Sequence, residues 1–154
     1  MKLSQAELNE FEFVKAITHN TIKSVYPHYY PSGAVEFFLK HHSDEKILED
    51  VKNGNVYLLR DDSDEYIGTV TVIDNEITRL FVLPEYQHKG FGRMLMDHAE
   101  IVIAQNHKTI ILHASLPAKN IYRKRGYVET GYNVIIAENG DYLCYDEMSK
   151  DISI

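Results

Sequence analysis

The sequence predicts an α+β fold in which a mixed, mostly antiparallel, twisted sheet is flanked by helices. Helical patterns fill the first third of the chain, whereas short runs rich in β-branched residues, separated by turn signals, fill most of the rest. The two kinds of element do not alternate regularly, as they would in a doubly wound parallel fold. Because 154 residues is an ordinary size for one domain, we expect residues 1–154 to share a single core.

Three helices are predicted before the first hairpin. Ser4 and Glu7 have the spacing of a capping box, and apolar residues then recur at a helical period over residues 8–22. Two prolines in the loop 26–31 end this first helix, because proline cannot continue it. The remaining helix signals are Ser32 as the cap of a second helix, Ser43 as the cap of a third, and the terminating pair Asn53-Gly54.

The strands are predicted from short β-rich runs. The first two runs form a hairpin around the acidic turn 61–64, and Pro84 stops the third run. A long helix after Gly92 and a short helix near residues 118–124 interrupt the later strands, and Asn139-Gly140 is typical of a closing hairpin. The strands are expected at residues 56–59, 66–73, 77–83, 110–114, 133–137 and 142–145.

Composition excludes several classes of function. The net charge of −7 argues against a nucleic-acid partner, because phosphate binding needs a basic excess, and it favours the attraction of cationic solutes. The single cysteine, Cys144, allows no intramolecular disulfide, and the N-terminus lacks an apolar signal core. No apolar run approaches the roughly 20 residues that span a bilayer. We therefore expect a cytoplasmic protein with no membrane partner.

The eight histidines do not predict a metal site. They show no H-x-x-x-H spacing, and one cysteine supplies no thiolate cluster. The adjacent pair His41-His42 points to different sides of a helix, while His98 and His107 are expected on the long helix as packing or surface residues. A serine hydrolase is also not predicted, since the sequence has no G-x-S-x-G elbow.

The segment 76–93 predicts a site for phosphate or pyrophosphate. It runs from a strand through a glycine-containing turn directly into a helix, whose first N–H groups lack intrahelical partners and carry the positive end of the dipole. Gly90 and Gly92 let an anion approach the backbone, and Lys89 and Arg93 add positive charge. The segment lacks the Walker pattern and the third glycine of a dinucleotide fingerprint. Two glycines alone are equally consistent with a helix entry chosen for packing.

The complete segment carries more information. The pattern Gln87-x-x-Gly90-x-Gly92, preceded by Leu80-Phe81-Val82-x-Pro84, resembles motif A of the GNAT superfamily of N-acetyltransferases. In that family the pattern is Q/R-x-x-G-x-G/A, and the loop binds the pyrophosphate of coenzyme A. His88 stands where a common version of the motif has glycine, which preserves a main-chain contact but restricts the loop.

A second segment supports the resemblance. Residues 115–127 are similar to the family's motif B, N-x-x-A-x-x-L/F-Y-x-K/R-x-G-F. Ser115 stands where the family often has asparagine. The residues that fit the motif are Ala118, Ile121, Tyr122, Lys124, Gly126 and Tyr127. The resemblance is strong from Glu76 to Tyr127 and topological elsewhere, and the family's first strand is expected to be very short or absent, because only residues 1–3 precede the first helix.

The resemblance implies the GNAT fold and acetyl-CoA as cosubstrate, without a metal. The strand around Val82 would pair with the pantetheine arm, and the motif A loop would hold the pyrophosphate. The implied cofactor-binding residues are Phe81, Val82, Leu83, Gln87, His88, Lys89, Gly90, Phe91, Gly92, Arg93, Ser115 and Tyr122.

Acetyl transfer to an amine needs a base, an oxyanion donor and an acid for the departing thiolate. The resemblance implies that the Val82 N–H stabilises the oxyanion and that Tyr122 protonates the sulfur. Glu76, eleven residues before Gln87, occupies the position of the base in some histone-type members. Tyr122 is also compatible with a core role, and Glu76 with a solvated turn.

An aromatic cluster precedes the second predicted helix, in a region that commonly borders the acceptor site in this family. Tyr26, Tyr29 and Tyr30 are candidates for binding a cationic amine through cation–π attraction, although packing of an ordinary loop explains them equally well.

The leading hypothesis is an N-acetyltransferase that uses acetyl-CoA to modify the primary amine of a small molecule by direct attack in a ternary complex. A peptide or protein lysine is an alternative acceptor, because an acidic groove also suits it. Two further alternatives are an acetyl-CoA sensor without turnover and an interaction domain that binds no cofactor. Since members of the family are often dimers, a homodimer is an expected assembly.

Overall fold

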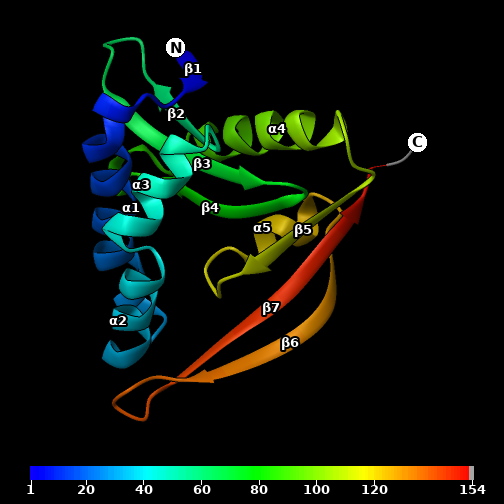
Figure 1. Cartoon of the computed structure of the whole chain (residues 1–154). Coiled ribbons are helices and arrows are strands. Elements are labelled where there is room, and N and C mark those ends of the chain that lie inside the picture. Colours follow the sequence, from blue (N-terminus) through cyan, green and yellow to red (C-terminus); the bar gives the residue numbers. More distant parts are fainter. Residues whose placement is uncertain (153–154) are drawn as a thin grey trace.

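In the computed structural model, which describes residues 1–152, the chain is built around one seven-stranded sheet (Figure 1). The strand order is β1-β2-β3-β4-β5-β7-β6, and every neighbouring pair is antiparallel except the parallel pair β4 and β5. The strands are β1 (Lys2–Gln5), β2 (Val56–Arg60), β3 (Tyr66–Ile73), β4 (Glu76–Val82), β5 (Thr109–Ala114), β6 (Val128–Ile136) and β7 (Tyr142–Asp151). The predicted mixed, mostly antiparallel sheet is confirmed.

Helices cover both faces of the sheet. Figure 1 shows α1, α2 and α3 together along one side of the molecule, with α4 apart from them. The helices are α1 (Phe11–Val25), α2 (Ser32–His41), α3 (Asp44–Lys52), α4 (Phe91–Ala104) and α5 (Lys119–Lys124), and the 3-10 turns are η1 (Leu8–Glu10), η2 (Tyr26–His28) and η3 (Pro84–Tyr86). One apolar cluster lies between the sheet and α1–α3, and a second packs α4 and α5 against the other face.

The N-terminus differs from the prediction. Ser4 does not cap a helix; it lies in β1, where it pairs with Leu58 of β2. The capping box is formed instead by Glu7 and Glu10, with the Glu7 N–H donating to the Glu10 carboxylate at 2.8 Å. The family's first strand is therefore present, because residues 2–5 satisfy their backbone groups at the edge of β2 and delay the helix to η1.

Three other elements were predicted with incorrect bounds. Strands β6 and β7 are longer than predicted, because their outer residues face solvent and are too polar or too irregular to read as strand. His107 does not belong to the long helix, since α4 ends at Ala104.

The sheet divides between β4 and β5, which pair only at Glu76–Ile111 and Ile77–Leu112. Beyond these two pairs β5 stays with β7, whereas β4 stays with β3. β4 also carries a bulge, because Arg79 pairs with Thr71 and Ile77 with Val72, so that Thr78 is an extra residue. Figure 1 shows β4 and β7 diverging on either side of this division. The gap places a cavity at the centre of the molecule.

Candidate active site

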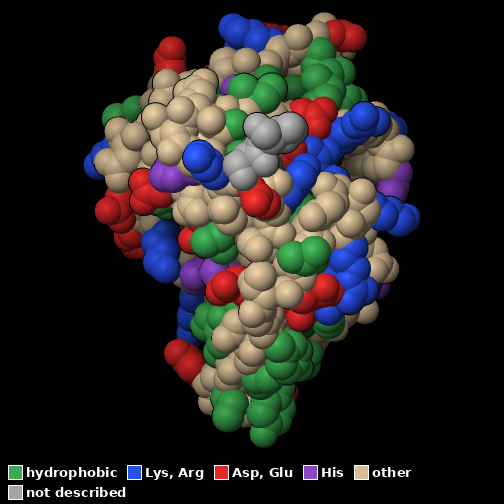
Figure 2. Space-filling model, turned by 90° about the vertical axis from the view of Figure 1, so that its right-hand side faces the viewer, with side chains coloured by type: hydrophobic (Ala, Val, Ile, Leu, Met, Phe, Trp, Pro, Cys, Tyr) green, Lys and Arg blue, Asp and Glu red, His purple; other side chains and the backbone are tan. Residues whose placement is uncertain are grey.

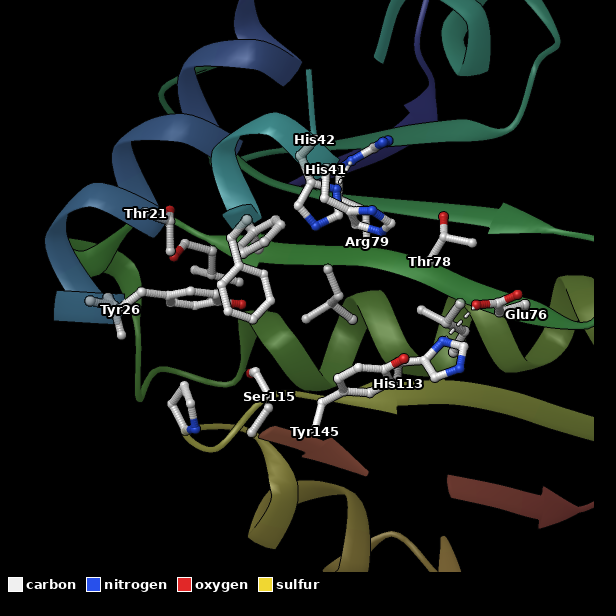
Figure 3. Close-up of a pocket in the computed structure, with 18 of the residues that line it drawn as sticks. Thr21, Tyr26, His41, His42, Glu76, Thr78, Arg79, His113, Ser115 and Tyr145 are labelled. Carbon is white, nitrogen blue, oxygen red and sulfur yellow. Dashed lines mark hydrogen bonds and ion pairs between the residues drawn. The ribbon is translucent and has the colours of Figure 1, made fainter. Parts of the chain in front are cut away.

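A cavity of about 630 Å³ occupies the division between β4 and β5. Its walls come from α1, the turn between α2 and α3, both diverging strands, α5 and β7. Figure 3 shows Tyr26 and Ser115 at one end of this space, and Glu76 and His113 at the other. The cavity is large enough for a small ligand together with part of a second one.

The backbone of β4 presents N–H groups to the cavity. Leu83 donates its N–H to the Ile67 carbonyl of β3 at 3.0 Å, so the backbone of Leu83 faces β3. Backbone direction alternates along an antiparallel strand, and therefore the N–H groups of Val82 and Leu80 face the opposite edge. Among the strands of residues 1–152, none pairs with β4 along that edge beyond Ile77. Both N–H groups are thus available to a ligand in the gap.

The Val82 carbonyl, which faces the same edge, is already engaged. It accepts a hydrogen bond from Gln87 Nε2 at 2.9 Å and a longer one from Thr21 Oγ1 at 3.4 Å. Gln87 therefore ties the motif A loop to the end of β4. This side-chain hydrogen bond helps to hold the predicted cofactor loop in its conformation.

The loop after β4 has the predicted geometry of an anion site. Gly90 is the N-cap of α4 and has φ +90°, and His88 also lies in the left-handed region with φ +61°. A Cβ at Gly90 would meet no atom within 4 Å, so the backbone there is open to a ligand. The first turn of α4 has neither a side-chain cap nor an acidic residue within the described chain. Its N–H groups are therefore left for an anion.

The charged residues of this loop are placed at the same helix start. Lys89 donates from Nζ to the Glu85 carbonyl at 3.0 Å, which folds the turn back on itself. Phe91 and Arg93 lie in the first turn of α4, and Phe91 packs near Tyr86. The positive φ of His88 explains why glycine is common at this position of the motif, because only glycine adopts this conformation without cost.

Tyr122 lines the cavity from α5 and is buried. Burial raises the pKa of Tyr122 to about 12. The phenol therefore keeps its proton at any pH below that value and is able to donate it to a nearby anion. The position matches the predicted role of Tyr122, which remains a prediction.

The three candidate tyrosines of the N-terminal loop have different positions. Tyr26 is buried, lines the cavity and hydrogen-bonds with the Ser115 side chain. Tyr30 is buried beside it and accepts the Leu116 N–H at 2.7 Å, which anchors the loop after β5. Tyr29 is 52% exposed and is not among the residues that line the cavity.

The far end of the cavity contains ionisable groups that the sequence did not single out. His113 of β5 contacts Glu76 of β4, with 3.0 Å between Nδ1 and the carboxylate oxygen. The other ring nitrogen lies 3.6 Å from a carboxylate oxygen of Glu147. The Tyr145 ring meets the imidazole edge-to-face at 5.4 Å.

Arg79 forms the upper wall of the same cavity and is 5% exposed. Its guanidinium donates to Asp50 at 3.0 Å, to Thr71 at 2.9 Å and to His42 Nδ1 at 3.2 Å. These bonds connect β4 with α3 and with the residue that ends α2. The neighbouring Thr78 lines the cavity, and its hydroxyl is buried without a hydrogen-bond partner in the described chain.

A weak sequence signal for Arg79 and His113 does exist. Each is a strongly polar residue inside an apolar strand, and Arg79, which is buried, requires partners. The sequence did not reveal their partners, because Asp50 and Glu147 lie far from them along the chain.

Residues 1–152 contain no group of three or more His, Cys, Asp or Glu side chains placed to hold a metal ion. In the same residues, no helix combines the length and the apolar character needed to cross a membrane.

Comparison with known proteins connects this geometry to a family. The family model described as an acetyltransferase (GNAT) domain matches residues 25–143. The tRNA uridine(34) acetyltransferase of Methanocaldococcus infernus is 30% identical over 127 residues, which cover 71% of this chain and 22% of that protein. The peptidyl-lysine N-acetyltransferase YjaB of Salmonella typhimurium is 30% identical over 70 residues, covering 46% of this chain and 48% of YjaB.

A solved structure shares the fold. The PaiA N-acetyltransferase of Thermoplasma acidophilum, in complex with coenzyme A, superposes with a TM-score of 0.70 at 22% identity, covering 97% of this chain and 98% of that one. The chain spans less than half the length of the two curated relatives in these alignments.

Proposed function

The chain belongs to the GNAT family of acetyltransferases, and on that premise we propose that it transfers the acetyl group of acetyl-CoA to a primary amine of a small molecule. The transfer is a direct attack within a ternary complex, without an acetylated enzyme. Residues 1–154 act in this proposal as one acetyltransferase domain.

The observation that carries the proposal is the open edge of β4 beside an uncapped helix start. The N–H groups of Val82 and Leu80 face the gap, and the first turn of α4 follows in the chain after η3 and the loop 87–90. An extended amide chain that enters the gap finds the edge of a strand, and a pyrophosphate at its end finds the helix N-terminus. These features fit the chemistry of coenzyme A, which supplies an activated acetyl thioester.

The transfer also needs a donor for the oxyanion and an acid for the departing sulfur, and we assign each to a residue of the chain. A backbone N–H of β4 holds the thioester oxygen as negative charge develops on it, and Val82 is our predicted donor. Leu80 is a second donor with the same orientation, two residues or about 7 Å away. Tyr122 gives its proton to the departing sulfur.

Glu76, the predicted base, lies six residues before Val82 along the strand, a distance of about 20 Å. Its carboxylate contacts His113, so any proton that it accepts from an amine near the thioester passes through other groups.

The acceptor in this proposal is a small cationic amine. The carboxylates Glu49, Asp50 and Glu76 and the cations Lys46 and Arg79 line the cavity, which leaves one carboxylate in excess. The cavity volume of about 630 Å³ suits a small molecule better than a folded protein. A peptide lysine is the second candidate, favoured by the relationship to a peptidyl-lysine N-acetyltransferase.

The proposal also includes the setting of the reaction. We place the enzyme in the cytoplasm, with neither a nucleic acid nor a membrane as partner, and we propose a homodimer as its assembly. The acidic composition and the single cysteine support the first two statements, and the surface of β6 and β7 supports the third.

The test is release of free coenzyme A from acetyl-CoA over a panel of polyamines, amino acids, aminoglycosides, arylamines and lysine peptides. We expect turnover with at least one small amine, and at least a 100-fold lower kcat in Tyr122→Phe with little change in acetyl-CoA affinity. Tyr132→Phe, which alters a 65% exposed tyrosine outside the cavity, is the matched control and should keep full activity.

The possible results distinguish the proposed enzyme from a sensor and from a domain that binds no cofactor. Unchanged turnover in Tyr122→Phe removes this residue from the mechanism. If acetyl-CoA raises the melting temperature but no amine is acetylated, the sensor alternative replaces the enzyme. If acetyl-CoA does not raise the melting temperature of the protein, the prediction that the loop 87–92 binds it is wrong.

A further inference from the structure

The end of the cavity remote from Tyr26 contains a histidine between two carboxylates. Nδ1 of His113 is 3.0 Å from the Glu76 carboxylate, and Nε2 is 3.6 Å from the Glu147 carboxylate. Figure 3 shows the Glu76–His113 contact bridging the two diverging strands. Glu76 and His113 both line the cavity, so this pair is accessible to a ligand within it.

Strand register places His113 closer than Glu76 to the β4 N–H groups that face the gap. β5 runs parallel to β4 from the Ile77–Leu112 pair, so the next residue, His113, is level with Thr78 at the bulge. From that level Leu80 lies two residues further, about 7 Å along the strand, and Val82 four residues further, about 13 Å, compared with about 20 Å between Glu76 and Val82. The imidazole extends into the gap from the opposite side, which shortens the distance that a proton must travel.

The two ring nitrogens have different surroundings. A separation of 3.0 Å is a hydrogen-bond distance, so a neutral imidazole donates its Nδ1–H to Glu76 and keeps the lone pair of Nε2. The 3.6 Å between Nε2 and Glu147 is too long for a hydrogen bond. The side chain is 43% exposed, so an amine or a water molecule has room to bond to Nε2.

We infer that His113 is the base that removes the proton from the acceptor ammonium, and that Glu76 is a positioning residue for it. The inference rests on the proposed acetyl transfer. In such a pair, the carboxylate fixes the tautomer of the neighbouring histidine and stabilises the imidazolium that forms during the reaction.

The complete reaction balances. The ammonium gives one proton to His113 Nε2, and the freed nitrogen lone pair forms the C–N bond to the thioester carbon. The C–S bond breaks, and the sulfur takes a proton from Tyr122. The new amide nitrogen loses its second proton, which restores the Tyr122 hydroxyl, and His113 releases its proton to solvent. One proton leaves for each acetyl group transferred.

The groups that face His113 come from three elements. Glu76 faces it from β4, Glu147 and Tyr145 from β7, and His41 from the last turn of α2. The two carboxylates lie at opposite ring nitrogens, so an imidazolium formed there faces negative charge on both sides. His41 and His42 are weaker candidates, because burial lowers the pKa of each and Arg79 lowers it further.

The experiment measures kcat/KM against pH with the most active amine of the panel. We expect His113→Gln to lower kcat/KM by about 100-fold or more, as general-base removal does, with unchanged stabilisation by acetyl-CoA. Glu76→Gln should lose less activity than His113→Gln, and the loss should fall on kcat rather than KM, because the imidazole keeps its Nε2 lone pair but loses the carboxylate that fixes its tautomer. His28→Gln, at an exposed histidine of η2, should match the wild type.

A second acceptor distinguishes loss of the base from damage to the structure of the site. Hydroxylamine is largely unprotonated at about pH 8, unlike an alkyl amine, and needs no base to become nucleophilic. His113→Gln should therefore keep most of its activity with hydroxylamine. Equal losses with both acceptors, or a variant with wild-type turnover and pH profile, would overturn the assignment of His113 alone. A wild-type protein that acetylates no amine would overturn the proposed function itself.

Discussion

At the scale of single residues, the wall of the cavity depends on Arg79 and His42, both buried in contact with each other. The Arg79–Asp50 ion pair is 3.0 Å long, and its partial burial makes each partner costly to remove without the other. Burial and the charge of Arg79 hold the pKa of His42 well below its ordinary value. His42 is therefore neutral in the folded protein, and its Nδ1 accepts the Arg79 hydrogen bond.

This neutral histidine predicts a dependence of stability on pH. Below the ordinary histidine pKa of 6.5, the unfolded chain binds a proton at His42 that the folded chain excludes, so stability is full above pH 6.5 and falls as the pH drops. The free energy of unfolding should fall by up to about 1.4 kcal/mol per pH unit from this residue. Urea unfolding at several pH values between 5 and 7.5 measures the slope.

The matched variants are His42→Gln, whose amide oxygen can still accept from Arg79, and His107→Gln at an exposed position. The first should show a flatter dependence on pH, and the second should keep that of the wild type. An identical slope in all three proteins would assign the acid sensitivity to other groups.

At the scale of elements, the predictions succeed where local chemistry decides the structure. Ser43 caps α3 as predicted, accepting the Lys46 N–H at 3.4 Å, and Asn53 ends that helix. Ser4 fails as a cap, because strand pairing with Leu58 competes with the local motif. The loop of motif A was recognisable because its backbone chemistry is local.

The acceptor end of the site was only partly predictable, for a different reason. Glu76 was singled out by its position in the motif, but its partner His113 comes from β5 and is brought to it by the parallel register of two strands. The bulge that makes Thr78 an extra residue depends equally on pairing with β3. Contacts of this kind are set by tertiary structure and have no local pattern.

The start of α4 permits a test of the cofactor loop. Gly90→Ala forces a side chain into the left-handed region at φ +90°, which should cost about 1–2 kcal/mol of stability, and places a methyl group where the anion approaches. We expect clearly weaker acetyl-CoA binding by calorimetry.

Gly140→Ala is the matched control, because Gly140 has φ +89° and equally open surroundings in the β6–β7 turn. It should lose similar stability and keep its affinity for acetyl-CoA. Equal loss of binding in both variants would show that strain, and not the added methyl group, is responsible.

At the scale of the whole molecule, the outer surface of the β6–β7 hairpin is unusually apolar. Tyr132, Val134, Ile136 and Tyr142 are each 48–65% exposed, and β6 is an edge strand of the sheet. Hydrophobic side chains gather toward the lower end of the face shown in Figure 2, where this hairpin lies. Exposed apolar surface on an edge strand favours association with another copy, since a twofold dimer pairs the same patch of both copies and removes it from water.

The proposed homodimer can be tested by light scattering after size-exclusion chromatography. The wild type should have about twice the chain mass of 17.8 kDa, and Ile136→Lys should shift it to the mass of one chain, because the dimer would bury two like charges. Ile101→Lys alters an equally exposed isoleucine of α4 and should remain dimeric. A monomeric wild type, or a dimer that tolerates Ile136→Lys, would argue against this interface.

The division of the sheet has a consequence for the living cell. Within residues 1–152, strand pairing between the group β1–β4 and the group β5–β7 consists of two residue pairs, and side-chain packing and single hydrogen bonds such as Leu116–Tyr30 and Glu76–His113 supply the rest of the connection. Acetyl-CoA bound in that seam, as proposed, would contact both strand groups and would bind only when both are in place. By mass action, the folded population then rises with the concentration of acetyl-CoA. The cellular concentration of acetyl-CoA would in this way also affect the lifetime of the protein that consumes it.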